Sequence, residues 1–232
     1  MKKSRLSTRV LASLFAPVLL LGVQQTALAE SSEWSDSFDP IEIVNDYQRD
    51  GLSETDRQLN SFAKTALLNQ ATDIQLALAK GDYANVTQHI HPKKGVQFSM
   101  YAYVQPKKDK RFSRQQFATY LKKSRVRFTW GEMDGSGHLL VIPLPTYLDE
   151  WVQAVDFNNA EVTINQSQGS GNSLNNIESV YPYANAKFAI VDFYNKGSKE
   201  YDGMDWRAMR LVFEEYQGKS YLVAVVNDEW TI

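Results

Sequence analysis

Hydrophobic and polar residues alternate most clearly over the last part of the chain, residues 205–232. Two runs rich in β-branched and aromatic residues flank Gln217 and Gly218, where glycine permits the positive φ of a tight hairpin turn. If those two residues form the centre of the turn, side chains alternate between the two sheet faces. The pattern then predicts one apolar face, made by the cross-strand pairs Phe213/Leu222, Leu211/Ala224 and Met209/Val226. The next pair is Arg207 opposite Asp228, so we expect an ion pair where the apolar face ends.

Helical periodicity is found earlier in the chain. Apolar residues spaced three and four apart predict a long helix over residues 54–80, with Ser53 as its N-cap. Its apolar stripe contains Leu59, Phe62, Ala63, Ala66, Leu67, Ile74, Ala77 and Leu78. Asp82 is placed to cap a short second helix, and Ser113 with Gln116 predicts a capping box for a third. A fourth short helix is expected over residues 146–152, after Pro145.

Further strands are predicted between and after these helices. They span residues 95–104, 125–131, 138–142, 160–164 and 187–194, and polar loops join them. Because helices dominate the first half and strands the second, the order favours an α+β fold over a βαβ array. We expect the long N-terminal helix to pack on the apolar face of a curved, mostly antiparallel sheet.

The N-terminus has the pattern of a secretory signal peptide. A basic stretch (Lys2, Lys3, Arg5 and Arg9) precedes an apolar run over residues 11–23 and an A-x-A cleavage site that ends at Ala29. The apolar run is shorter than the roughly 20 residues that cross a bilayer, which disfavours a membrane anchor. We therefore predict cleavage after residue 29, a mobile acidic arm over residues 30–52, and one domain over residues 53–232. The mature protein would be periplasmic or secreted, and no later stretch is predicted to span a membrane.

Charge and cysteine content restrict the function classes. The chain has no cysteine, so its stability must come from a packed core. Removal of residues 1–29 leaves 21 basic and 27 acidic residues, a formal charge of −6. This acidic balance argues against nucleic acid or an anionic membrane as a partner. The basic run over residues 107–111 is interpreted as a solvated loop tip.

Two blocks of sequence carry a resemblance to a known fold. Residues 91–99 read His-Pro-Lys-Lys-Gly-Val-Gln-Phe-Ser, and the second block comprises residues 203–214 and 228–232. With the early helix, the break at residues 79–83, and the glycine-rich segments 134–137 and 169–172, they resemble an exported bacterial group of NTF2-like (nuclear transport factor 2-like) domains of unknown function. The resemblance implies a cone-shaped fold, the cystatin-like cone, over roughly residues 58–232. It implies no activity, cofactor or catalytic residue.

Histidines are the first candidates for site chemistry. His89 and His91 are two residues apart, a spacing that suits a metal only on a strand. Here they straddle a helix end before Pro92, so we favour a structural role for His91 in the turn and expect no metal site. His138 follows the glycine-rich segment 134–137, and its imidazole is a candidate general base. For both the segment and His138, a structural role in a hairpin turn is the favoured alternative.

Charged and aromatic residues at one end of the hairpin form the main candidate pocket. Asp205, Arg207, Asp228 and Glu229 cluster there, beside Trp206 and Trp230. A structural ion pair that closes the sheet is the favoured alternative to a reactive site. The ligand-binding candidates are Arg207, Asp228, Asp205, Trp206, His138, Tyr101 and Met209.

Three functions remain open from the sequence. The first is an exported binding module that holds a small apolar or amphipathic ligand, or an envelope partner, between helix and sheet. The second is an acid–base enzyme with Asp228 or Asp205 as the base, assisted by His138 or Tyr101. The third is a structural or interaction protein of the envelope, with a homodimer as one form. No nucleotide-binding, zinc-protease or nucleophile-elbow motif is present, and no cofactor is expected.

Overall fold

The computed structural model describes residues 54–123, 125–169, 174–184 and 187–231. The expected signal peptide and acidic arm lie outside these residues. The helices are α1 (Glu54–Ala79), α2 (Tyr83–His89), α3 (Arg114–Leu121), α4 (Leu144–Tyr147), which continues as a π-helical turn (Leu148–Val152), and α5 (Ile177–Val180). The strands are β1 (Val96–Ser99), β2 (Lys110–Phe112), β3 (Arg127–Glu132), β4 (Leu139–Pro143), β5 (Glu161–Ile164), β6 (Phe188–Asn195), β7 (Arg207–Tyr216) and β8 (Lys219–Glu229).

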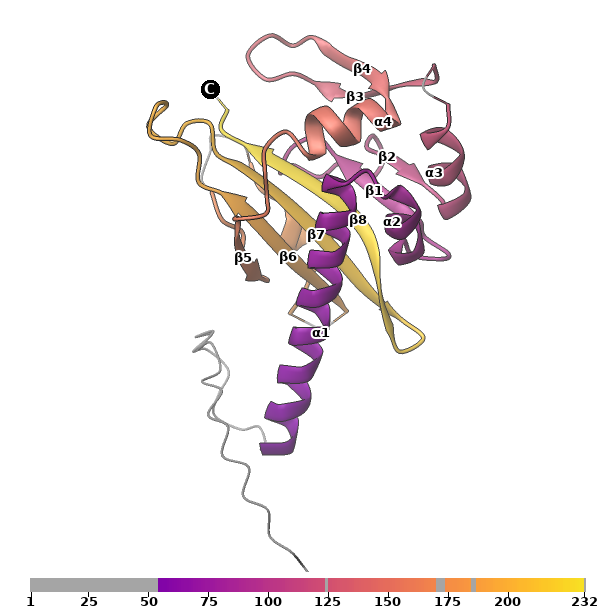
Figure 1. Ribbon diagram of the computed structural model, residues 1–232, viewed down its shortest axis with the longest axis vertical. Helices are drawn as coiled ribbons and strands as arrows, with labels where there is room; N and C mark the ends of the chain where they lie inside the picture. Colours follow the sequence, from indigo (N-terminus) through magenta and orange to yellow (C-terminus); the bar gives the residue numbers. More distant parts are fainter. Residues whose placement is uncertain (1–53, 124, 170–173, 185–186, 232) are drawn as a thin grey trace, which may run out of the picture. The chain divides into compact units, whose positions relative to one another are not determined.

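The strands form two sheets. The larger has the order β2-β1-β8-β7-β6-β5, and the smaller is the β3–β4 pair (Figure 1). Neighbouring strands are antiparallel except β1 and β8, which are parallel. The expected α+β class with a mostly antiparallel sheet is therefore confirmed. The parallel pair places β1, which follows α2, beside β8, the last strand, although the two strands are far apart in sequence.

Helix caps follow the sequence pattern closely. The Asp82 carboxylate accepts a hydrogen bond from the Asn85 amide at 3.2 Å and so caps α2. Ser113 and Gln116 form the complete capping box of α3, each side chain accepting from the other residue's backbone amide. These side chains satisfy amide groups that the first helical turn leaves without intrahelical partners.

The closing hairpin has the expected turn but not the expected register throughout. Gln217 and Gly218 both have positive φ (54° and 71°), as a type I′ turn requires. Pairing follows the prediction as far as Phe213 opposite Leu222. Val223 is then an additional residue, a β-bulge, and Val212 lies opposite Ala224. The predicted pairs beyond this point are wrong by one position.

The bulge changes which residues share a face. Beyond it, Leu211 lies opposite Val225 and Arg210 opposite Val226. Buried residues of one face include Val191, Phe193, Met209, Leu211, Phe213, Leu222 and Val225, which share a core with α1, α2, β1 and the π-helical turn. Buried residues of the other face include Ile190, Val212, Val223, Ala224 and Val226, which pack with Val104 and α5. The prediction of a single apolar face is therefore wrong, because both faces of β7 and β8 are covered.

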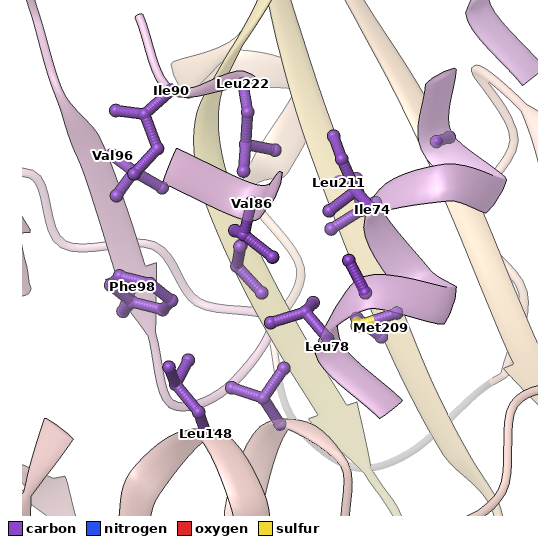
Figure 2. Close-up of a cluster of buried hydrophobic side chains, with 14 of the residues drawn as sticks. Ile74, Leu78, Val86, Ile90, Val96, Phe98, Leu148, Met209, Leu211 and Leu222 are labelled. Carbon is purple, nitrogen blue, oxygen red and sulfur yellow. The ribbon is translucent and has the colours of Figure 1, made fainter. Parts of the chain in front are cut away.

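Figure 2 shows the first core, in which Ile74 and Leu78 of α1 lie beside Met209 and Leu211 of β7. Among the α1 residues whose side chains the structure describes, those in this core begin at Leu67. Phe62 is 73 % exposed, and the predicted stripe residues Ala63 and Ala66 are also exposed. Of the predicted stripe, Leu67, Ile74, Ala77 and Leu78 are buried.

Candidate functional site

The β-bulge divides the predicted pocket residues between the two sheet faces. Arg207 and Met209 lie on the face that packs with α1, and Tyr101 adjoins it. Asp228 lies on the other face with Arg210, and Trp206 likewise contacts groups on that side. The predicted Arg207–Asp228 pair does not form, because Arg207 lies opposite Glu229 and makes its salt bridge there.

Trp151, on the π-helical turn, brings Tyr101 and Arg207 together. The Tyr101 and Trp151 rings meet edge to face, with centroids 6.0 Å apart, and the Arg207 guanidinium lies 5.9 Å from the Trp151 ring centroid. The Trp151 indole donates to the Met100 carbonyl at 3.2 Å, which fixes the ring. Trp151 was not among the sequence candidates, since nothing in a short helical segment distinguishes an aromatic residue in a site from one in the core.

A shallow depression adjoins Tyr101. It has a volume of about 350 Å³ and is lined by Tyr101, Glu132, Met133, Asp134, Gly135 and Gly137. Gly135 and Gly137 have φ of 70° and 66°, which confirms that the segment 134–137 forms a hairpin turn requiring the left-handed region. The Asp134 amide donates to the Tyr101 hydroxyl at 2.9 Å and so ties the turn to the ring. Burial raises the pKa of Tyr101.

The remaining predicted residues do not converge on this depression. His138 is exposed, and its amide and carbonyl serve the β3–β4 turn, bonding to Ser136 Oγ and the Met133 amide. Asp205 accepts from the Ser198 amide at 2.7 Å, and this hydrogen bond lowers the pKa of the Asp205 carboxyl. Met209 is fully buried in the core.

Trp206 packs into a crowded corner behind the sheet. It is 5 % exposed, and its ring centroid lies 5.8 Å from that of Tyr194. Gly169 approaches so closely that a Cβ there would lie 2.7 Å from Trp206 Cζ3. The role of Trp206 in the structure is therefore to pack the loop that follows β5 against the end of β7.

A buried ionic cluster lies on the same face, and we call it the Arg210 clasp. It comprises Asp192 on β6, Arg210 on β7 and Asp228 on β8. The Arg210 side chain, which is fully buried, donates to Asp192 at 3.1 Å, to Asp228 at 2.8 Å and to the Gln168 carbonyl at 2.7 Å. The Gln168 amide donates in turn to Asp192 at 2.7 Å. The clasp thus joins three strands and a loop.

Burial dominates the electrostatics of the clasp. It raises the pKa of both Asp192 and Asp228, while the Arg210 charge opposes the rise. Within the described residues, no donor reaches Oδ1 of Asp192. Two carboxylates therefore share one guanidinium without bulk water. The geometry is that of a structural clasp, since the reactive atoms are sealed from any substrate.

The two neighbouring histidines serve local structure. Nδ1 of His91 accepts from the amides of Lys93 and Lys94 at 3.1 and 3.0 Å, which confirms its predicted role in the turn. Burial lowers the pKa of His91, whose side chain is sealed beside Tyr216. Nδ1 of His89 instead lies 3.1 Å from the Gln70 amide nitrogen. In the part of the chain that the structure describes, no three metal-ligating side chains gather into a possible metal site.

Comparisons with known proteins provide no family for this chain. No family model matches it, and no curated protein matches it either. Among the helices within the described ranges, none is both long and apolar enough to cross a membrane.

Proposed function

We propose that this protein is a binding module that holds a small amphipathic ligand at the depression beside Tyr101. The observation that carries the proposal is the depression itself, with two carboxylate-bearing residues, Glu132 and Asp134, on its wall next to a fixed aromatic pair. Loops on a rigid scaffold are common places for binding residues. Here the β3–β4 turn and the π-helical turn would supply the ligand contacts.

The lining favours a ligand that carries a cationic group. Carboxylates attract a cation, and the faces of Tyr and Trp stabilise one through their ring quadrupole. Arg207 already lies over the Trp151 ring, which supports the suitability of that ring for a positive charge. Met133, 39 % exposed, adds apolar surface for the rest of such a ligand.

The tight packing of the core favours a ligand site at the depression beside Tyr101 over a site between α1 and the sheet. Met209, Leu211 and Leu222 are completely buried among side chains of α1, α2 and β1. The small apolar ligand that the apolar pattern suggested would have to displace these contacts, at a cost of about 2–5 kcal/mol for each large side chain removed from its packing.

An acid–base enzyme has less support. Asp228 is sealed in the Arg210 clasp, and Asp205 is engaged by the Ser198 amide. His138 points its backbone into the turn and lies outside the residues that line the depression. A general base must reach a substrate proton within about 3 Å, and these groups do not share one space.

We also propose that the domain has an NTF2-like cone and that the protein is exported. Support for the fold comes from the long α1, the short α2 that follows it, and the mostly antiparallel sheet whose one face packs with both. Support for export comes from the basic, apolar and A-x-A pattern of residues 1–29. Sequencing the N-terminus of protein secreted by a bacterial host tests export, and a mature chain that starts at Met1 would contradict it.

The ligand site is tested with benzyltrimethylammonium, a small cation with an aromatic ring. Titration followed by amide NMR should shift the Asp134 amide and the Trp151 indole. The Tyr101→Ala variant and the Glu132→Gln/Asp134→Asn double variant should each weaken binding by about tenfold, the value of one cation–π contact or one charge contact.

A matched control neutralises two exposed carboxylates elsewhere, in the Asp73→Asn/Glu215→Gln variant. These residues lie on α1 and at the turn end of β7. Binding should be unchanged in the control. Equal weakening in both double variants would show nonspecific attraction of the cation to an acidic protein, and shifts spread evenly over the surface would rule out the site.

A further inference from the structure

Charge is distributed very unevenly along the chain. Residues 91–127 contain eleven Lys and Arg residues and a single acidic residue, Asp109. Residues 128–232 contain 6 basic and 15 acidic residues. The acidic overall balance therefore conceals one strongly basic segment, of which the run at residues 107–111 is only a part.

The fold gathers this segment on one side of the larger sheet. It contributes β1, β2, α3 and the start of β3, which lie together at the β2 edge, away from β5 and β6 (Figure 1). The Arg111 guanidinium reaches across to the Gln97 side chain, and Arg114 donates to the Ile90 carbonyl. We call the eleven residues the basic flank: Lys93, Lys94, Lys107, Lys108, Lys110, Arg111, Arg114, Lys122, Lys123, Arg125 and Arg127.

The basic flank is mostly exposed and contains far more basic than acidic residues. Nine of its residues are exposed, and Lys110 and Arg114 are half-buried. Across the described residues, Lys94 alone among the eleven has a salt bridge, to Glu214 at 2.6 Å. Asp109 is engaged internally, accepting from the Gln105 amide at 2.8 Å and the Gln97 side chain at 2.9 Å. A concentration of like charge costs self-repulsion, which an anionic partner would relieve.

The arginines and the lysines of the basic flank differ in their contacts. Arg111, Arg114 and Arg127 donate to protein acceptors, so their forked guanidinium groups are engaged within the fold. Lys107, Lys108, Lys122 and Lys123 have exposed side chains. An ammonium on a flexible stem is a point charge that adapts to scattered anions, whereas sequence reading of nucleic acid relies on arginine forks and stacked aromatic rings.

We propose that the basic flank docks on a membrane surface rich in anionic phospholipid headgroups. Tyr103, 47 % exposed, precedes the 105–109 turn, and Val126, 36 % exposed, lies between Arg125 and Arg127. Amphipathic rings and small apolar groups among lysines suit the headgroup region of a bilayer. The acidic remainder of the domain would be repelled, which orients the flank toward the membrane. The flank lies at the other end of β3 from the turn at Tyr101, so the inference does not depend on the ligand site.

Vesicle flotation of the purified chain tests the proposal. Binding should occur to vesicles of phosphatidylcholine with about 30 % phosphatidylglycerol, and be much weaker to phosphatidylcholine alone. It should decline as salt rises from about 0.05 to 0.3 M, because the Debye length falls below the spacing of surface charges. The charge-reversed variant Lys107→Glu/Lys108→Glu/Lys122→Glu/Lys123→Glu should lose at least about tenfold in affinity for the anionic vesicles.

The matched control reverses four exposed lysines outside the flank, in Lys64→Glu/Lys196→Glu/Lys199→Glu/Lys219→Glu. It has the same net charge as the flank variant. Its decrease in the logarithm of vesicle affinity should be less than half that of the flank variant. Circular dichroism of both variants checks the fold. Equal losses in the two variants, or binding that ignores phosphatidylglycerol, would overturn the proposal. So would tighter binding to a short DNA duplex than to the vesicles at the same salt, which would assign the flank to nucleic acid.

Discussion

Arg207 and Arg210 lie three residues apart on the same strand, yet they occupy opposite physical environments. Arg207 lies over the Trp151 ring, with a side chain that is 32 % exposed and one carboxylate partner, Glu229. Arg210 faces the opposite side, is completely buried, and holds two carboxylates and a carbonyl. An odd spacing on a strand sends two side chains to opposite faces, so one strand supplies both a surface group and an internal clasp.

The difference teaches that position, not residue type, decides what an arginine contributes. A half-exposed ion pair remains hydrated and stabilises a fold by at most about 1 kcal/mol. A buried guanidinium must be matched by its partners, because each charge left alone in the interior costs several kcal/mol. The first arrangement leaves Arg207 adjustable near a candidate ligand site, and the second makes Arg210 part of the framework.

The largest expected effect follows removal of the buried charge. Arg210→Met should lower the free energy of unfolding by about 3–5 kcal/mol, because Asp192 and Asp228 would remain buried without a cation. Urea unfolding followed by tryptophan fluorescence measures the loss. The triple variant Asp192→Asn/Arg210→Met/Asp228→Asn should recover part of it, since it leaves no uncompensated charge. A loss under about 1 kcal/mol in Arg210→Met would show that water reaches the clasp.

The next largest effect tests the loop that the clasp anchors. Gly169→Ala should cost about 1–3 kcal/mol, because φ is +80° and the new Cβ would meet the Trp206 ring at 2.7 Å. Gly137→Ala is the matched control, with φ of +66° and no atom within 4 Å of the added Cβ. The control should cost only the strain of the backbone, about 1 kcal/mol. Thermal unfolding measures the loss of stability in both variants. Equal losses would mean that the added Cβ at position 169 does not clash with the Trp206 ring.

Local signals explain why much of the fold was predictable from the sequence. The hairpin turn at Gln217-Gly218 and the capping box at Ser113 each depend on residues close in sequence, and both are present. The parallel pairing of β1 with β8 joins segments more than a hundred residues apart, and no local pattern specifies it.

The candidate site was harder to predict because a single bulge residue changes every later pair. Val223 is apolar like its neighbours, so its extra position leaves the alternation readable in either register. Asp192 and Arg210 were missed for a related reason. A charged residue within a β-rich run indicates a solvent-facing position unless its partners are known, and Asp192 lies 18 residues from Arg210.

The contribution of the Arg210 clasp to the free energy of unfolding should depend on pH. Burial raises the pKa of Asp228 above its unfolded value of about 3.9. Its contribution to stability is therefore complete below that unfolded pKa and is lost as pH rises through the higher pKa of the folded state. The free energy of unfolding of the wild type minus that of Asp228→Asn should fall as pH rises above about 3.9. A flat Asp228 profile would contradict the assignment.

The smallest stability effect is expected at Arg207, where a substitution should change ligand binding more than stability. Arg207→Met should cost less than Arg210→Met, about 1 kcal/mol, because the Arg207 side chain is partly exposed to solvent. Loss of the guanidinium would uncover the Trp151 face and remove a positive charge near the depression, so benzyltrimethylammonium should bind about two- to fivefold more tightly. Isothermal titration and urea unfolding of the same preparation measure both quantities. A stability loss as large as that of Arg210→Met would show that the two arginines are equally structural, whereas weaker binding of the cation would contradict a site in which Arg207 competes with it for the Trp151 face.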